Sequence, residues 1–372
     1  MRGRPGSARA LFWQGLLIVG ALALVAYLVG NAQANLAKRS LTFGFGFLAR
    51  PAGFDIPFHI PAWQPSDSYG RALWVCLVNT LVVSGLSIIT GSVVGLLLGL
   101  MRLSDNWLAR NTALWVIELV RNTPQLVQLV FWYAGVLQAL PPVRQSLGLP
   151  LGSYLNVRGL FLPWPVLPPG AGWLPAALAA SLVLLPFLWL ARVRGHQLGP
   201  MALALPLALL LALILLMRGI DRPLLQGFNF RGGVVLPPEL VALWLGLTVY
   251  ASAFIAEIVR ASIEAVPKGQ REAARALGLR PGPEMFLVVL PQALRIMIPP
   301  LTSQYLNIIK SSTLGAAVAY PEIVQIFAGT VLNQSGRAIE VIALVMGVFL
   351  VINLAVSAVM NWYNRKILLT DR

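Results

Sequence analysis

Residues 73–101 read LWVCLVNTLVVSGLSIITGSVVGLLLGLM, an apolar stretch in which no side chain is charged. A helix that crosses about 30 Å of hydrocarbon, at about 1.5 Å per residue, needs about 20 such residues. This stretch is longer, so we expect its helix to tilt or to extend into the interface. Of the 372 residues, 58% are hydrophobic and only 11% are charged, which is too little charge to coat a soluble domain of this size. The sequence therefore predicts an all-α, polytopic membrane bundle.

Similar apolar blocks recur along the chain and predict about eight transmembrane helices. We expect them at residues 11–30, 73–101, 111–140, 173–190, 201–217, 240–259, 296–320 and 339–362. The first block could instead be a cleaved signal peptide, because Ala32-Gln33-Ala34 resembles a cleavage site. Its apolar run exceeds the roughly 7–15 residues of a signal, so we interpret it as a retained helix.

The segments between the blocks complete the domain organisation. Two of them, 31–71 and 141–172, are rich in Gly, Pro and aromatic residues, which is typical of interfacial loops or of short helices on the membrane surface. We expect three regions: an N-terminal helix with its outer segment at 1–72, a transmembrane domain at 73–362 with an inserted helix pair around 173–218, and a tail at 363–372.

The distribution of charge predicts the orientation of the chain. The formal net charge is +15, but Lys and Arg are scattered over short loops, which argues against nucleic acid as a partner. Basic residues in a membrane protein instead mark cytoplasmic loops. With the N-terminus inside, 16 Lys and Arg fall in inner segments and 10 in outer ones, and the most basic loop, 259–295, lies inside. We expect a multi-pass membrane protein, surrounded by lipid, with both termini cytoplasmic.

The sequence shows no pattern for covalent chemistry. Cys76 is the single cysteine and lies in an apolar block, where we interpret it as a small core residue. The two histidines, His59 and His196, are far apart and lack metal-ligand spacing. Zinc-protease, CxxC and nucleophile-elbow patterns are absent, and so is a Walker-type glycine loop. We therefore expect no catalytic residue and no metal site, and no ATP hydrolysis by this chain.

The most informative segment is residues 256–314, and its central part, residues 267–281, reads PKGQREAARALGLRP. Pro267 and Gly269 mark a turn, and residues 270–277 are strongly helix-forming. Gly278 stands where a helix cap is expected, and a proline follows as a stop. The alanines make the helix slim and suited to a groove on a partner protein. The alternative is an ordinary basic loop whose charge only sets topology.

The spacing in and after this segment resembles the EAA loop of bacterial ABC importer permeases. Glu-Ala-Ala is followed by three residues, Gly, nine residues and the run Val288-Val289-Leu290-Pro291, with Val288 where that family has Ile. In that family the loop forms a coupling helix that docks in a groove of the ATPase subunit. The resemblance assigns this role to Glu272, Ala273, Ala274, Gly278 and Pro291.

Two flanking elements resemble the polar amino acid importers, the histidine/glutamine permease family. They are residues 266–270, VPKGQ, and residues 120–129, VRNTPQLVQL, in which Asn122 replaces a family Gly. The resemblance covers the predicted spans two, three and six to eight, which are the five-helix core of a type I permease. The additional parts, with GFGFL at 44–48 and AGFDI at 52–56, resemble the Q-type permease of general L-amino acid importers, including the glutamate/glutamine type.

The resemblance implies an ATP-driven importer of a bacterial inner membrane that moves amino acids by alternating access. Its expected partners are an ABC ATPase dimer, a second, non-identical permease and a periplasmic amino-acid-binding protein. ATP and Mg would bind to the ATPase, and this chain would hold no cofactor. An ABC importer for another solute is one alternative. An ion-coupled transporter is another, but it predicts inverted repeats and an intramembrane carboxylate, and we find no repeat. A non-transporting scaffold would leave the loop pattern unexplained.

Two charged pairs at i,i+3 spacing lie in the predicted spans near their cytoplasmic ends. Glu118 pairs with Arg121, and Glu257 pairs with Arg260. One interpretation is interfacial charge that snorkels to water. The other is an inner gate around the substrate path.

Lys310 lies in the middle of the seventh predicted span, where an isolated Lys costs roughly 2.5–3.5 kcal/mol. It therefore needs water or a partner, in the pore, at a domain interface or in a pair inside the bundle. Further polar residues of spans three and seven could bind the ammonium and carboxylate of an amino acid, or could form interhelical hydrogen bonds. They are Asn122, Thr123, Gln128, Gln304 and Asn307.

Overall fold

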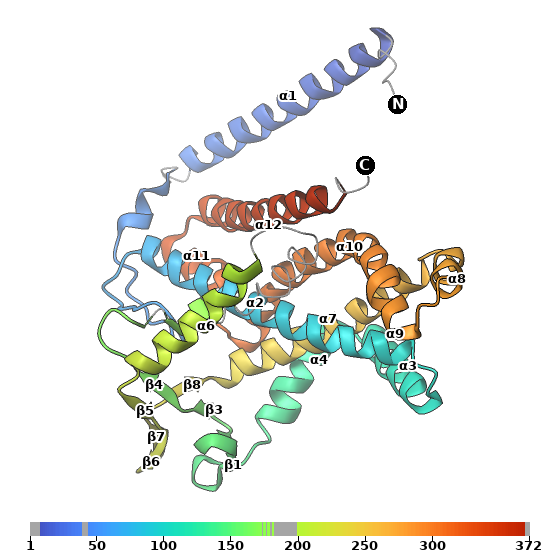
Figure 1. Cartoon of the computed structure of the whole chain (residues 1–372). Helices are drawn as coiled ribbons and strands as arrows, with labels where there is room; N and C mark the ends of the chain where they lie inside the picture. The colour runs from blue at the N-terminus through green and yellow to red at the C-terminus, as the bar shows by residue number, and fades with distance from the viewer. Residues whose placement is uncertain are drawn as a thin grey trace.

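The computed structural model describes residues 8–38, 44–172, 174–175, 177–178, 181 and 199–368 (Figure 1). Four of its helices are long and apolar enough to cross a membrane, at Tyr69–Arg102, Pro238–Glu264, Pro281–Val318 and Ala338–Trp362. Three shorter apolar helices lie at Phe12–Leu28, Gln125–Leu137 and Ala204–Leu216. The all-α, polytopic class is thus confirmed, while most of the fourth predicted span, 173–190, lies outside the described residues.

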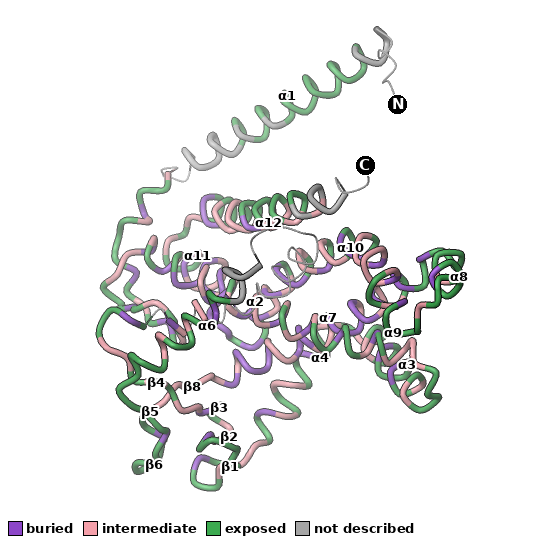
Figure 2. The backbone as a smooth tube through the Cα atoms, viewed as in Figure 1, coloured by how far each residue is buried: buried purple, intermediate pink, exposed green. Residues whose placement is uncertain are grey.

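Helices α2 (Tyr69–Arg102) and α7 (Pro238–Glu264) form the centre of the bundle. They approach closely because α2 presents Gly91, Gly95 and Gly99 to α7. A Cβ built on Gly95 would lie 2.7 Å from the Cβ of Ile255. Figure 2 shows that α7 is the most buried of the long helices, whereas α1 (Ala8–Lys38) is exposed at residues 12–24.

The third predicted span is wrong as a single helix. Helix α3 (Trp107–Arg121) is separated by three residues from α4 (Gln125–Val130), which continues as a π-helix at Phe131–Leu137. Pro124 explains the break, because proline lacks an N–H and disfavours helical geometry at the residue before it. The sequence pattern 111–140 was apolar enough to conceal this break.

The seventh span begins earlier than the predicted residue 296. Helix α9 (Pro281–Glu284) continues through a π-helix at Met285–Val289 into α10 (Leu290–Ser311) and a 3₁₀-helix at Ser312–Val318. The π-helix ends two residues before Pro291, where the regular hydrogen-bond ladder loses a donor. After a π-helix at Val324–Val331, α11 (Leu332–Ser335) and α12 (Ala338–Leu368) complete the chain.

Short β-strands, which the sequence analysis did not predict, form a subdomain at one end of the bundle. The strands β1 to β8 lie at Leu147–Leu149, Ser153–Asn156, Gly159–Leu162, Trp164–Val166, Gly219–Asp221, Leu224–Gln226, Asn229–Arg231 and Val234–Leu236. They pair antiparallel in the orders β1-β2-β3-β8, β4-β5 and β6-β7. Helix α6 (Gly199–Leu216) lies between β4 and β5 in the chain. We call these strands and their turns the β-subdomain.

Residues 44–68, which precede α2 and which we call the Phe-rich segment, pack against the bundle. The segment contains a 3₁₀-helix at Phe45–Ala49 and buries Phe47, Ile56 and Trp63 against α2 and α12. The carboxylate of Glu340 accepts a hydrogen bond from the Gly44 N–H at 3.2 Å, and Arg337 donates to the Gly44 carbonyl at 2.7 Å. These contacts fix the segment to the start of α12.

Candidate functional site

The predicted amphipathic helix is present as α8 (Lys268–Ala276), at the end of the bundle opposite the β-subdomain (Figure 1). It begins after Pro267 and ends at a glycine in the left-handed region, Gly278, with φ of 78°. The Leu279 N–H donates to the Ala274 carbonyl at 3.1 Å, and the Gly278 N–H donates to the Arg275 carbonyl at 2.9 Å. This pair of bonds is the Schellman cap that satisfies the last carbonyls of a helix.

Polar contacts fix α8 to the helices on either side of it. Arg275 forms a two-bond ion pair with the buried Glu284 of α9, with Nε–Oε2 at 2.8 Å and Nη2–Oε1 at 3.3 Å. Hydrogen bonding to that carboxylate raises the pKa of the Arg275 guanidinium. Arg271 donates to the Ile263 carbonyl of α7 at 3.1 Å, and Gln292 of α10 donates to Gln270 at 3.2 Å. A displacement of α8 must therefore move α7, α9 and α10 as well.

The five residues of the EAA resemblance do not share one surface. Glu272, Ala273 and Gly278 are exposed, whereas Ala274 is buried and faces the neighbouring helices. Pro291 is the second residue of α10. Next to the exposed residues, Leu277 is 83% exposed although it is apolar. The small side chains and this leucine leave a slim, uncovered face on α8.

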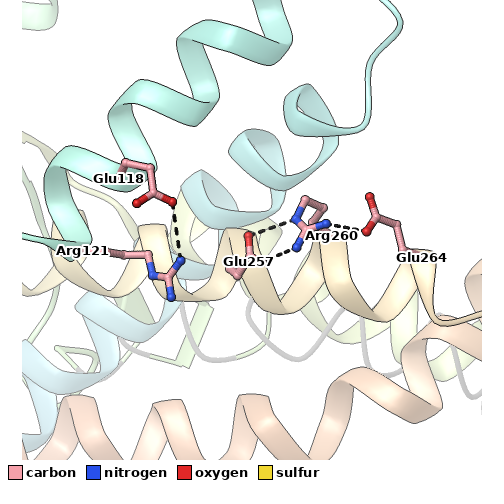
Figure 3. A network of polar contacts seen from close by, with 5 residues as sticks. All are labelled: Glu118, Arg121, Glu257, Arg260 and Glu264. Atoms are coloured by element: carbon pink, nitrogen blue, oxygen red, sulfur yellow. Dashed lines mark hydrogen bonds and ion pairs between the residues drawn. The ribbon is translucent and has the colours of Figure 1, made fainter.

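The two predicted charge pairs lie on α3 and α7, in the half of the bundle nearer α8 (Figures 1 and 3). Glu118 and Arg121 form a loose contact, with Oε1 and Nη1 3.9 Å apart. Arg260 is held more firmly, because its guanidinium binds both Glu257 and Glu264.

The sequence analysis missed Glu264 as the third member of the α7 cluster, although its i,i+4 spacing from Arg260 was visible. Arg121 also lies over the ring of Phe254, 5.5 Å from its centroid, and so joins α3 to α7. The structure thus brings the two pairs onto neighbouring helices.

The polar residues of the third span occupy the break between α3 and α4. Gln128 is buried, and its Nε2 donates to the carbonyls of Val120 at 2.8 Å and Thr123 at 3.0 Å. Both carbonyls lie next to the break at Pro124. The Gln128 side-chain amide thus supplies hydrogen bonds to backbone groups at the end of α3, where the regular helical pattern stops. Asn122 caps α3 and donates to Glu118, and the Thr123 hydroxyl donates back to the Leu119 carbonyl. Their contacts stabilise the break.

The polar residues of the seventh span divide between two faces of α10. Gln304 is buried, whereas Ser303, Asn307 and Lys310 are exposed at positions i, i+4 and i+7, which form one stripe. Lys310 lies in the last turn of α10 rather than in the middle of the span. Within the described ranges no acidic side chain lies within ion-pair distance of its ammonium. Beside it, the Ser311 hydroxyl donates to Gln125 of α4 at 3.0 Å.

A buried polar junction near the β-subdomain end was not predicted. The amide of Asn79 donates to the carbonyls of Phe58 at 2.9 Å and Pro321 at 3.0 Å, and the Tyr320 hydroxyl donates to the Asn79 carbonyl at 3.0 Å. Glu322 is fully buried and accepts bonds from the N–H groups of two following residues. In the sequence, the only sign of this junction was the polar residue Asn79 within the apolar block 73–101. In the described part of the chain, no cluster of His, Cys, Asp or Glu is arranged to hold a metal.

Comparison with known proteins identifies the family. Residues 198–369 match the model of the binding-protein-dependent transport system inner membrane component. YhdX of Escherichia coli (strain K12), named as a candidate amino-acid ABC transporter permease, is 48% identical over 98% of this chain and 96% of its own. The general L-amino acid transport system permease protein AapQ of Rhizobium johnstonii is 42% identical over 98% of this chain and 93% of its own.

A solved structure agrees with these relatives. One chain in the crystal structure of an amino acid ABC transporter with histidines superposes with a TM-score of 0.50 and 21% identity, covering 80% of this chain and 95% of that chain. This likeness shows the fold alone. Together with the two relatives aligned over nearly their full length, it leads to one conclusion: the chain belongs to the family of amino-acid ABC transporter permeases, membrane components that are not themselves enzymes.

Proposed function

We propose that this chain is the permease subunit through which an ATP-driven, binding-protein-dependent importer carries amino acids into the cytoplasm. The observation that carries the proposal is α8, a capped helix with a slim exposed face that Arg271 and Arg275 fix to the bundle. The names of the full-length relatives support an amino acid as the substrate. Another small solute is the alternative, and an ion-coupled transporter is not favoured.

The proposed assembly contains two permease and two ATPase chains, with ATP and Mg in the ATPase. A second, non-identical permease covers the polar stripe of α10, because Asn307 and Lys310 are exposed on a helix that crosses lipid. The water-filled translocation path then lies between the two permeases and is lined on this side by the polar stripe of α10. Ordinary lipid contact with the same side chains would cost several kcal/mol.

The proposed motion begins when ATP closes the ATPase dimer and pulls on α8. The ion pair from Arg275 to Glu284 carries the motion to α9 and α10, and the bond from Arg271 to Ile263 carries it to α7. The charge cluster on α3 and α7 then changes its pairing as the inner end closes. Glu118, Arg121, Glu257 and Arg260 thus act as the inner gate.

The proposed orientation places α8 in the cytoplasm of a bacterium whose inner membrane holds the chain. The described ends of α1 and α12, at Ala8 and Leu368, lie toward the same side of the bundle as α8 (Figure 1). This arrangement supports two cytoplasmic termini.

The test is uptake by proteoliposomes that contain this permease with the second permease and ATPase encoded beside it. Radiolabelled amino acids should accumulate only when ATP is inside and the loaded binding protein is outside. Uptake that needs an ion gradient instead, or no uptake of any amino acid, would contradict the proposal.

A further inference from the structure

The β-subdomain carries a basic surface that the transport path does not explain. Its two stretches of chain, residues 141–172 and 218–237, contain five arginines and one acidic residue, Asp221. The carboxylate of Asp221 accepts a hydrogen bond from the Gly233 N–H at 2.8 Å. The exposed arginines of the described part of this region are Arg144, Arg158, Arg218, Arg222 and Arg231. Outer loops tend to lack such residues, so topology does not account for them.

The β6–β7 hairpin orders part of this surface. Phe230 is buried and packs on Tyr154, with ring centroids 4.6 Å apart, and on Phe161 at 5.0 Å. In the same hairpin, Phe228 and Arg231 are exposed, and Phe228 is 75% exposed. The guanidinium of Arg144 lies 4.8 Å from the centroid of the Phe228 ring. Exposed aromatic and arginine side chains held in place are characteristic of the centres of protein–protein interfaces.

A hollow of about 570 Å³ lies where the β-subdomain meets α6. It is lined by apolar side chains and one arginine, including Leu151, Pro163, Pro165, Leu213, Met217 and Arg222. A partner protein that inserted an apolar side chain here, with a carboxylate beside it, would contact the apolar lining and pair its carboxylate with Arg222.

The β-subdomain is connected directly to the helix that leads to α8. Strand β8 pairs with β3, with Leu160 opposite Leu236, and the chain then enters α7 at Pro238. The other end of α7, at Glu264, lies four residues before the start of α8. A protein that binds to the β-subdomain and displaces it would therefore displace the end of α7 that is opposite α8.

We propose that the β-subdomain is the docking surface for the soluble binding protein, whose contacting face is acidic with apolar side chains among the carboxylates. The inference rests on the proposed function, because it needs a binding-protein-dependent importer. Charge complementarity selects this occupant, since a second basic copy of the subdomain would be repelled. A lipid surface fits less well. Arg218 lies two residues after the end of α6, whereas Arg231 lies in the β6–β7 hairpin, which projects beyond α6 (Figure 1). A flat bilayer would contact only charges that lie at one level.

The test uses the complete importer in liposomes and the binding protein encoded beside it, titrated while ATP hydrolysis is measured. Arg144→Glu with Arg231→Glu should raise the binding-protein concentration for half-maximal stimulation by about tenfold, because steering charges change association rates 10-fold or more. The maximal rate and the hydrolysis without binding protein should stay unchanged. The milder pair Arg144→Gln with Arg231→Gln should give a smaller shift in the same direction and guards against misfolding.

Arg50→Glu is the matched control, because Arg50 is also exposed and basic but lies in the Phe-rich segment. An equal shift in this control, or no shift in the Arg144 and Arg231 variants, overturns the docking surface while the importer assignment stands. A defect that appears only in liposomes containing phosphatidylglycerol would assign the surface to lipid instead. Absence of stimulation in the wild-type complex would contradict the proposed function itself.

Discussion

At the scale of single residues, Gly278 shows how far local sequence rules reach. Its place after a short helix and before Pro281 predicted a left-handed cap, and the structure confirms the conformation. A Cβ at this position would meet no atom within 4 Å, so a substitution changes backbone strain and not packing. Gly278→Val should cost roughly 1–2 kcal/mol and distort the end of α8. We expect poor co-purification of the ATPase and strongly reduced uptake.

Gly278→Asn is the control for that variant, because asparagine adopts the left-handed region more readily than other residues. It should retain most of the uptake and the ATPase association. Equal coupling in the Val and Asn variants would show that the cap of α8 is unimportant for docking.

Lys310 carries the second prediction at this scale. Sequence position alone placed it mid-span, but the early start of the seventh span moves it into the last turn of α10, on an exposed stripe. Lys310→Met keeps the length of the side chain and removes the charge. Uptake should fall, while the amount of inserted protein stays the same or rises, since an exposed cation in lipid is costly. The measurements are uptake of radiolabelled amino acids and immunoblots of the membrane fraction. Normal transport by this variant would show that Lys310 does not contribute to the translocation path.

At the scale of elements, the contact between α2 and α7 gives a prediction about stability. An alanine at Gly95 would place its Cβ 2.7 Å from Ile255 and 2.9 Å from the Ser252 carbonyl, so the helices must separate. Overpacking of this kind costs about 1–3 kcal/mol. Cys76 is the single cysteine and is buried in the native bundle, so a thiol-reactive dye reports unfolding. Gly95→Ala should lower the temperature of dye reaction by several degrees.

Gly85 on the same helix supplies the matched control, because its Cβ would meet nothing within 4 Å. Gly85→Ala should leave the reaction temperature of Cys76 unchanged or raise it slightly, since alanine favours helix. Similar losses in both variants would mean that close approach at Gly95 does not hold the two helices together.

Elements were predictable where one strong signal decided them. Apolar length placed α2, α7 and α12, and turn residues placed α8. The break after α3 depends on Pro124 and on Gln128, whose amide donates to the carbonyls of Val120 and Thr123, and apolar periodicity carries no trace of these polar contacts. The strands are three or four residues long, and β3 pairs with β8, which is more than 70 residues away in the chain. Short strands with distant partners leave no local pattern.

At the scale of the whole molecule, the two ends of the bundle have different chemistry. One end bears the capped helix α8, and the other bears the arginine-rich β-subdomain (Figure 1). Helix α7 spans the distance between them. The sequence analysis predicted the first end from its spacing. It described part of the second, residues 141–172, only as an interfacial loop or a short helix on the membrane surface, because the aromatic stack that orders this end joins residues 154, 161 and 230.

This polarity gives the last prediction, which concerns topology. Reporter fusions that are active only in the cytoplasm should be active at Lys268 and inactive at Pro168, because these residues lie at α8 and beside β4 at opposite ends of the bundle. A fusion after residue 368 should match Lys268, since α12 ends on the side of α8 (Figure 1). The basic residues around α8 hold this end inside, as expected from the charge bias of cytoplasmic loops. If Lys268 reported an outer location, α8 could not meet an ATPase that binds cytoplasmic ATP. The β-subdomain would then face the cytoplasm, out of reach of a periplasmic binding protein, so a single inverted fusion would remove both proposals together.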